Sequence, residues 1–196
     1  MSNTSKLGPE LNALLERGEI SPEAYAEYAA TADVGSAAAT GDAAARPARP
    51  REVLYTAEAV VEGGRAGHGR TSDGRLDVDL SVPAAMSGDD GPGTNPEQLF
   101  AVGFAACFQS ALLGVARGRK LDATGSRMTS HVGIGPLDSG GFGIQVSLDL
   151  HAPNVTAEDA HDLMLRAETR CPYSNATRGN IIVALSVDGV PVERVS

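Results

Sequence analysis

A long apolar segment dominates the middle of this chain. Residues 99–116 approach the length of a membrane span, but they include two polar residues and two glycines, so we interpret them as a buried helix. Asn95 is a suitable N-cap and Pro96 a suitable first residue, which predicts a helix from Pro96 to about Arg117. Nearly every face of it is apolar, and such a helix is normally buried on all sides, in a core or a subunit interface.

The segments around this helix have the patterns of strands. Leu76 to Val82 alternate between apolar and polar residues, the period of a half-buried strand. Strands are predicted at residues 53–62, 76–82, 127–134, 142–150, 181–187 and 190–194. A second helix is predicted from Thr156 to Cys171, where Pro172 ends it. Pairs of strands that alternate with two helices predict an α+β fold, with antiparallel sheet around the buried central helix.

Charge and composition exclude several classes of partner. The chain has 25 acidic and 16 basic residues, a net charge of −9, which disfavours nucleic acid and anionic membranes as partners. Aromatic residues make up 4% of the chain and Trp is absent, so few side chains are available to stack on nucleic-acid bases. The N-terminus lacks the apolar core of a signal peptide, so we expect a cytoplasmic protein with reduced thiols.

The sequence changes character near residue 50. Residues 1–33 are predicted to form a helical hairpin appendage or a partly disordered tail, and are too few to hold a core alone. Residues 34–51 are rich in Ala and Pro and are typical of a linker. Residues 52–196 are long enough for one domain with a sizeable core.

The chain has two cysteines in unusual local settings. Cys107 lies inside the apolar helix, and Cys171 directly precedes a proline. Two cysteines this far apart are no zinc site by themselves, and the four histidines are scattered without ligand spacing. The pair is compatible with a structural disulfide, two unrelated buried thiols, or a redox couple in which one thiol attacks and the other resolves. In the cytoplasm a persistent structural disulfide is uncommon.

Several motifs resemble those of a known family. The segments TNPEQLF (residues 94–100), AACF (105–108) and CPYSNATRGN (171–180) resemble the signatures of the organic hydroperoxide resistance proteins, the Ohr branch of the OsmC/Ohr superfamily. Residues 55–67 are similar to the first hairpin of that family, and the resemblance runs over about residues 52–195. It implies an OsmC/Ohr-like fold assembled as an intertwined homodimer.

The resemblance also implies roles for four residues. Cys107 would attack the O–O bond of a hydroperoxide and become a sulfenic acid, and Cys171 would condense with it to a disulfide. Arg65 would stabilise the Cys107 thiolate and orient the hydroperoxide, and Glu97 would hold the guanidinium through a bidentate pair. Without the resemblance, Arg65 would be interpreted as a solvent-exposed arginine in a turn. Glu97 would be interpreted as an acidic residue that interacts favourably with the dipole at the start of a helix.

Substrate and reductant follow from the same resemblance. Phe100, Phe104 and Phe108 would supply an apolar wall that suits alkyl or fatty-acyl hydroperoxides. No metal, flavin or haem is implied, and an external dithiol, a dihydrolipoyl group on a protein partner, would restore the thiols. Two alternatives are a peroxidase of the OsmC branch with another substrate preference, and a non-enzymatic thiol redox sensor or scaffold that recruits a partner through residues 1–33.

The spacing along the central helix bears on how the site is assembled. Glu97 and Cys107 are ten residues apart, about 15 Å along an unbroken helix. A pair of Glu97 with Arg65 that reaches Cys107 of its own chain needs a kink, for instance at Gly103, or a long reach. We therefore expect Arg65 and Glu97 to serve the Cys107 of the partner in a homodimer.

Overall fold

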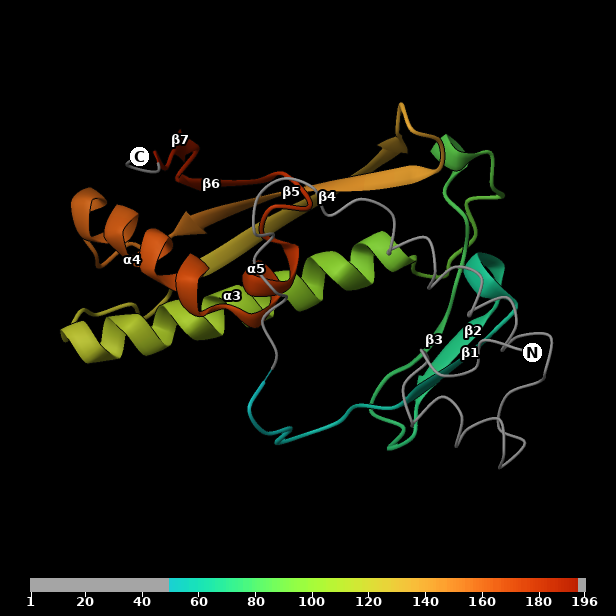
Figure 1. The fold of residues 1–196 in the computed structure, drawn as a ribbon, viewed down its shortest axis with the longest axis horizontal. Coiled ribbons are helices and arrows are strands. Elements are labelled where there is room, and N and C mark those ends of the chain that lie inside the picture. The colour runs from blue at the N-terminus through green and yellow to red at the C-terminus, as the bar shows by residue number, and fades with distance from the viewer. Residues whose placement is uncertain (1–49, 194–196) are drawn as a thin grey trace, which may run out of the picture. The chain divides into compact units, whose positions relative to one another are not determined.

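The computed structural model describes residues 50–193, so the predictions for residues 1–33 and for most of the linker lie outside the described residues. Figure 1 shows the order of the elements. Before the central helix α3 (Pro96–Arg119) come β1 (Ala59–Glu62), η2 (Gly64–Ala66), β2 (His68–Thr71), β3 (Asp77–Asp79) and η3 (Ala84–Met86). After it come β4 (Arg127–Pro136), β5 (Phe142–His151), α4 (Ala157–Arg170), α5 (Pro172–Thr177), β6 (Val183–Val187) and β7 (Val190–Pro191). The mixed α+β class that the sequence predicts is confirmed.

Helix α3 begins and continues as its sequence predicts. The Asn95 side chain accepts the backbone N–H of Gln98 at 2.9 Å, which satisfies one of the free donors at the helix start. The helix runs unbroken to Arg119 and ends at Lys120, whose φ of 59° gives a left-handed C-cap. It is long and apolar enough to pass for a membrane span by composition. Its buried residues are Phe104, Phe108, Leu112, Val115 and Ala116, so one side of it forms the core of a folded domain.

The opposite side of α3 is uncovered within one chain. Val102 is 71% exposed and Ala106 and Ser110 are exposed as well. The expectation that the helix is buried on all sides is therefore not met by a single chain. A surface of this kind is available to a second molecule.

A four-stranded sheet in the order β4-β5-β6-β7 packs against α3 and α4, as Figure 1 shows. β4 and β5 pair antiparallel over ten residues, from Arg127 opposite His151 to Pro136 opposite Phe142. β6 pairs antiparallel with β7 but parallel with β5, so the prediction of an antiparallel sheet is wrong at this one junction. The physical reason is the crossover through α4 and α5, which lets β6 run in the same direction as β5.

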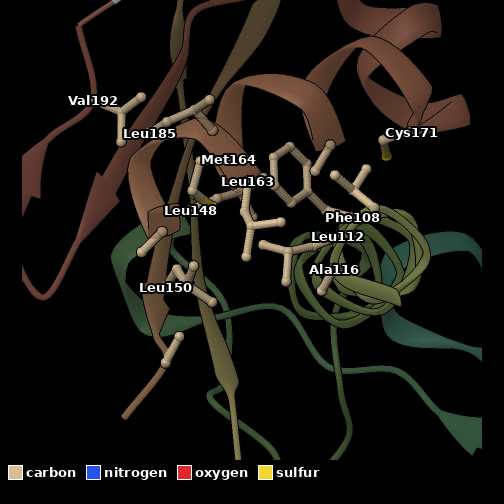
Figure 2. Packing of buried hydrophobic residues seen from close by; sticks show 14 of the residues in the cluster. Phe108, Leu112, Ala116, Leu148, Leu150, Leu163, Met164, Cys171, Leu185 and Val192 are labelled. Atoms are coloured by element: carbon tan, nitrogen blue, oxygen red, sulfur yellow. The ribbon is translucent and has the colours of Figure 1, made fainter. Parts of the chain in front are cut away.

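The hydrophobic core lies between α3, α4 and this sheet, and Figure 2 shows its side chains. Its largest fully buried members are Phe104, Phe108, Leu112, Leu148, Leu150, Leu163, Met164 and Cys171. Burial of a single large apolar side chain contributes about 1.5–3 kcal/mol to folding. The core therefore fixes the position of α3 relative to α4 and places Cys171 at its edge.

A second sheet, in the order β1-β2-β3, precedes α3 and buries little. All four residues of β1 are exposed, among them Val60 at 56% and Val61 at 58%. The predicted strands at residues 53–62 and 76–82 are shortened here to four and three residues. A sheet this small usually needs other elements packed on its apolar side, because strand pairing alone stabilises it only marginally. The exposed valines of β1 lack such cover within one chain.

The chain after α4 contains a helix that the sequence did not predict. Cys171 ends α4 with extended backbone angles, because a residue before proline avoids the helical region. Pro172 then occupies the first position of the short helix α5, where its missing N–H carries no penalty. Ser174 and Asn175 lie on this helix.

Candidate active site

The two cysteines lie side by side although 64 residues separate them. The Cys171 Sγ is 3.5 Å from the Cys107 Sγ, and both thiols are free. Cys107 projects from the middle of α3, and Cys171 lies at the junction of α4 and α5. Cys171 has no exposed surface, whereas Cys107 is half-buried. A disulfide bond is about 2 Å long, so a small movement is enough to join the two sulfurs.

An aromatic cluster holds α5 against α3 beside the thiols. The Tyr173 ring stacks on Phe100, with centroids 5.9 Å apart and planes at 23°, and contacts Phe104 at 5.7 Å. Gly103 lies next to this ring, since a Cβ there would lie 3.4 Å from it, at ordinary contact distance. Sequence analysis missed this role of Tyr173. Its position two residues after Cys171 was the available signal.

The surroundings of Cys107 disfavour its thiolate. Burial raises the pKa of the Cys107 thiol above its usual value. The backbone N–H of Tyr173 acts on the sulfur in the opposite sense, and the adjacent Cys171 thiol raises the pKa further. The net shift is upward, so at neutral pH this thiol is protonated unless a cation approaches it.

Arg65 and Glu97 form a bidentate ion pair at the start of α3. Arg65 Nη1 donates to Glu97 Oε2 at 2.9 Å, and Arg65 Nη2 donates to Glu97 Oε1 at 2.6 Å. The glutamate side chain is 14% exposed and the arginine side chain 38%. Hydrogen bonding to Arg65 lowers the pKa of Glu97, and the same bonding raises the pKa of Arg65. The pair that the sequence predicts is therefore present and stays fully charged at neutral pH.

The ion pair and the thiols form two separate groups within one chain. In the part of the chain that the structure describes, the Arg65 guanidinium contacts Glu97 and the Met86 sulfur, but not Cys107. Helix α3 continues through Gly103 without a break. The short route from Arg65 to Cys107 of the same chain, through a kinked helix, is thus not used.

The three phenylalanines of the predicted pocket wall occupy different environments. Phe104 and Phe108 are fully buried in the core, and Phe100 is partly buried against Tyr173. An open groove of about 350 Å³ lies next to Glu97 instead, at the start of α3. It is lined mainly by η3, the first turns of α3 and β4, including Met86, Ala101, Ser130, Val132 and Ile134. Between residues 50 and 193 no group of His, Cys, Asp and Glu has an arrangement that could hold a metal ion.

The fold and these two groups define the class of protein. A central helix that carries one thiol, packs against a sheet and faces a second thiol is an OsmC-like architecture. The sequence profile of OsmC-like proteins matches residues 88–186 of this chain. The chain belongs to the OsmC/Ohr family, on its organic hydroperoxide resistance branch.

Individual relatives agree with this assignment. An organic hydroperoxide resistance protein of Xanthomonas axonopodis pv. citri (strain 306) is 49% identical over 141 residues, which are 71% of this chain and 99% of that one. The crystal structure of the protein OhrB of Bacillus subtilis matches with a TM-score of 0.63 and 43% identity over 69% of this chain and 99% of that one. A Vibrio cholerae organic hydroperoxide resistance protein with captopril bound in one of its active sites matches with a TM-score of 0.69 and 44% identity, over 73% and 98% of the chains.

The contact of Tyr173 with Gly103 leads to a prediction about thiol oxidation. Gly103→Leu places a branched side chain where the Tyr173 ring lies, and we expect disulfide formation by a mild oxidant to slow about tenfold or more, because α5 moves away from α3. Gly103→Ala is the matched control, since its Cβ makes an ordinary contact and alanine favours the helix. Thiol counting against time measures the rates. Equal rates in the two variants would contradict the positioning role of this contact.

Proposed function

We propose that this protein is a cysteine-based, thiol-dependent peroxidase that reduces organic hydroperoxides to alcohols and protects against oxidative stress. The observation that carries the proposal is the 3.5 Å approach of the half-buried Cys107 thiol to the fully buried Cys171 thiol. Membership of a family whose relatives are named for organic hydroperoxide resistance supports the substrate class. The apolar surroundings of Cys107 suit an alkyl or fatty-acyl hydroperoxide.

The proposed reaction has three steps. The Cys107 thiolate attacks the distal oxygen of the hydroperoxide, the O–O bond breaks, and the alcohol leaves after it takes up a proton. Cys171 then attacks the Cys107 sulfenic acid, which forms the disulfide and releases water. An external dithiol reduces the disulfide through a mixed disulfide and leaves in the oxidised, cyclic form. We infer a dihydrolipoyl group on a protein partner as this dithiol, with no bound cofactor and a cytoplasmic location.

Burial supports Cys107 as the sulfur that the reductant attacks. Cys171 has no exposed surface, so an incoming thiolate meets the half-buried Cys107 sulfur first. Attack on Cys107 leaves Cys171 as the departing thiolate. The same sulfur thus meets the hydroperoxide and the reductant in turn, through one entrance.

A second copy of the chain supplies what one chain lacks. Burial raises the pKa of Cys107, and Arg65 of the same chain lies with Glu97 rather than with this thiol. The exposed sides of α3 and β1, with Val102, Val60 and Val61, offer apolar surface for a partner. We propose a homodimer in which Arg65 and Glu97 of one chain act on Cys107 of the other.

The decisive experiment follows turnover with the two cysteine variants. Cys107→Ser abolishes the reduction of cumene hydroperoxide with dihydrolipoamide as reductant. Cys171→Ser permits one turnover and then oxidises beyond sulfenic acid at Cys107, because no thiol remains beside it. Mass spectrometry after one equivalent of peroxide locates the oxygen. A sulfenic or sulfinic group on Cys171 would reverse the two roles, and a wild type that consumes a single equivalent would indicate a sensor rather than an enzyme.

The proposed role of Arg65 predicts a shift in thiol ionisation. If its guanidinium stabilises the Cys107 thiolate in the dimer, Arg65→Ala raises the pKa of Cys107 and moves the pH dependence of its alkylation to higher pH. Arg70→Ala is the control, because Arg70 is an exposed arginine of the neighbouring β2. Both changes are made in a Cys171→Ser background so that one thiol is measured. Coincident pH profiles for the two arginine variants would remove Arg65 from the site.

Subunit exchange tests where Arg65 acts. A Cys107→Ser protein mixed with an Arg65→Ala protein forms heterodimers with one doubly defective site and one intact site, if the arginine serves the partner. Hydroperoxide turnover then returns in part as exchange proceeds. Absence of recovery despite exchange confirmed by native mass spectrometry would show that each chain completes its own site.

A further inference from the structure

A methionine lies against the catalytic arginine proposed above. The Met86 Sδ is 4.0 Å from Arg65 Nη1, the same nitrogen that donates to Glu97 Oε2 at 2.9 Å. The position of Met86 is fixed by its helical turn, because its backbone N–H donates to the carbonyl of Pro83 at 2.9 Å. The next residue, Ser87, caps that turn with a φ of 61°. The backbone at Met86 is therefore fixed, and from it the side chain reaches the guanidinium.

Met86 is also open to small molecules. It is half-buried and lines the 350 Å³ groove beside Glu97. Met164 is fully buried in the core, and Met128 packs against the core from β4. Neither Met128 nor Met164 lines this groove, so a hydroperoxide that approaches Arg65 through it meets the thioether of Met86.

We propose that Met86 is a modification site, oxidised to the sulfoxide by hydroperoxide and acting as a brake on Arg65; this inference rests on the proposed peroxidase function. The thioether lone pair attacks the distal oxygen of the hydroperoxide, an S–O bond forms and the O–O bond breaks. The sulfur loses two electrons, the peroxide gains them, and a proton moves from the distal to the leaving oxygen, which departs as the alcohol. No other oxidant or reductant is needed.

The sulfoxide changes what Arg65 can bind. A thioether is a weak hydrogen-bond acceptor, whereas a sulfoxide oxygen is a strong one, and oxidation would add this oxygen to a sulfur that lies 4.0 Å from Arg65 Nη1. The guanidinium is then held by Glu97 and by the sulfoxide, with fewer donors left for a hydroperoxide or a thiolate. An enzyme that has met excess peroxide therefore slows, and methionine sulfoxide reductases release the brake.

The test uses the full-length protein and one substitution. Wild type and Met86→Leu are treated with excess tert-butyl hydroperoxide, reduced with dihydrolipoamide to regenerate the thiols, and assayed against their own untreated rates. Peptide mass spectrometry is expected to show one added oxygen on Met86 before Met128 or Met164. The kcat/KM of treated wild type falls about tenfold, as the diversion of a charged hydrogen-bond donor implies. The methionine sulfoxide reductases A and B restore it, and Met86→Leu shows no such reversible loss.

The outcomes separate this inference from the proposed function. An untreated protein without peroxidase activity, whose Met86 still gains oxygen, overturns the proposed function and with it the brake, but leaves the modification site. An active protein whose Met86 stays unmodified while Met128 is oxidised overturns the inference alone. A loss of activity that is equal in Met86→Leu and resists the reductases also overturns it, because that behaviour belongs to over-oxidised Cys107.

Discussion

The packing of α3 against the α4–α5 segment sets the geometry on which both thiols depend. Phe108 and Leu112 of α3 and Leu163 and Met164 of α4 are fully buried in one core cluster, and such close packing opposes sliding of the two helices. Cys171, at the end of α4, is part of the same core. The 3.5 Å separation of the sulfurs is thus a property of the core rather than of a loop.

This packing places two requirements of thiol chemistry in opposition. Proximity to Cys171 needs a tightly packed neighbourhood, yet the same burial raises the pKa of Cys107 and disfavours the nucleophilic form. A cation that approaches from outside the core would stabilise the thiolate without any loss of packing around it. The Arg65–Glu97 pair is suited to this task, since the carboxylate holds the guanidinium while leaving part of it exposed.

Local sequence signals predicted much of the fold, and tertiary contacts account for what they missed. The capped helix at Asn95 and the β4–β5 hairpin follow from residues that are neighbours in sequence, and both were predicted to within a few residues. The parallel pairing of β5 with β6 depends on the direction of a long crossover, which no local pattern encodes. Helix α5 was not predicted, because Pro172 indicates the end of one helix and here also begins another.

The same distinction between local signals and tertiary contacts applies to the residues of the candidate site. Both cysteines and the Arg65–Glu97 pair were found through motifs, whereas the stacking of Tyr173 over Gly103 required knowledge of which helices touch. Phe100, Phe104 and Phe108 were expected to form a pocket wall, but their spacing along α3 places Phe104 and Phe108 on its buried side, where they belong to the core.

The uncovered surfaces of the chain point to one common explanation. Apolar residues remain exposed on β1 and on the outer side of α3, and Arg65, the proposed partner of the Cys107 thiolate, is bonded to Glu97 in the same chain. Each of these features alone is unremarkable in a soluble domain. Together they support the proposed homodimer, in which a symmetric partner would cover α3 with the same surfaces that carry its own Arg65. In such a dimer, assembly would also activate the thiol, and a mutation that weakens the interface is expected to reduce Cys107 reactivity even where it leaves the fold of each chain intact.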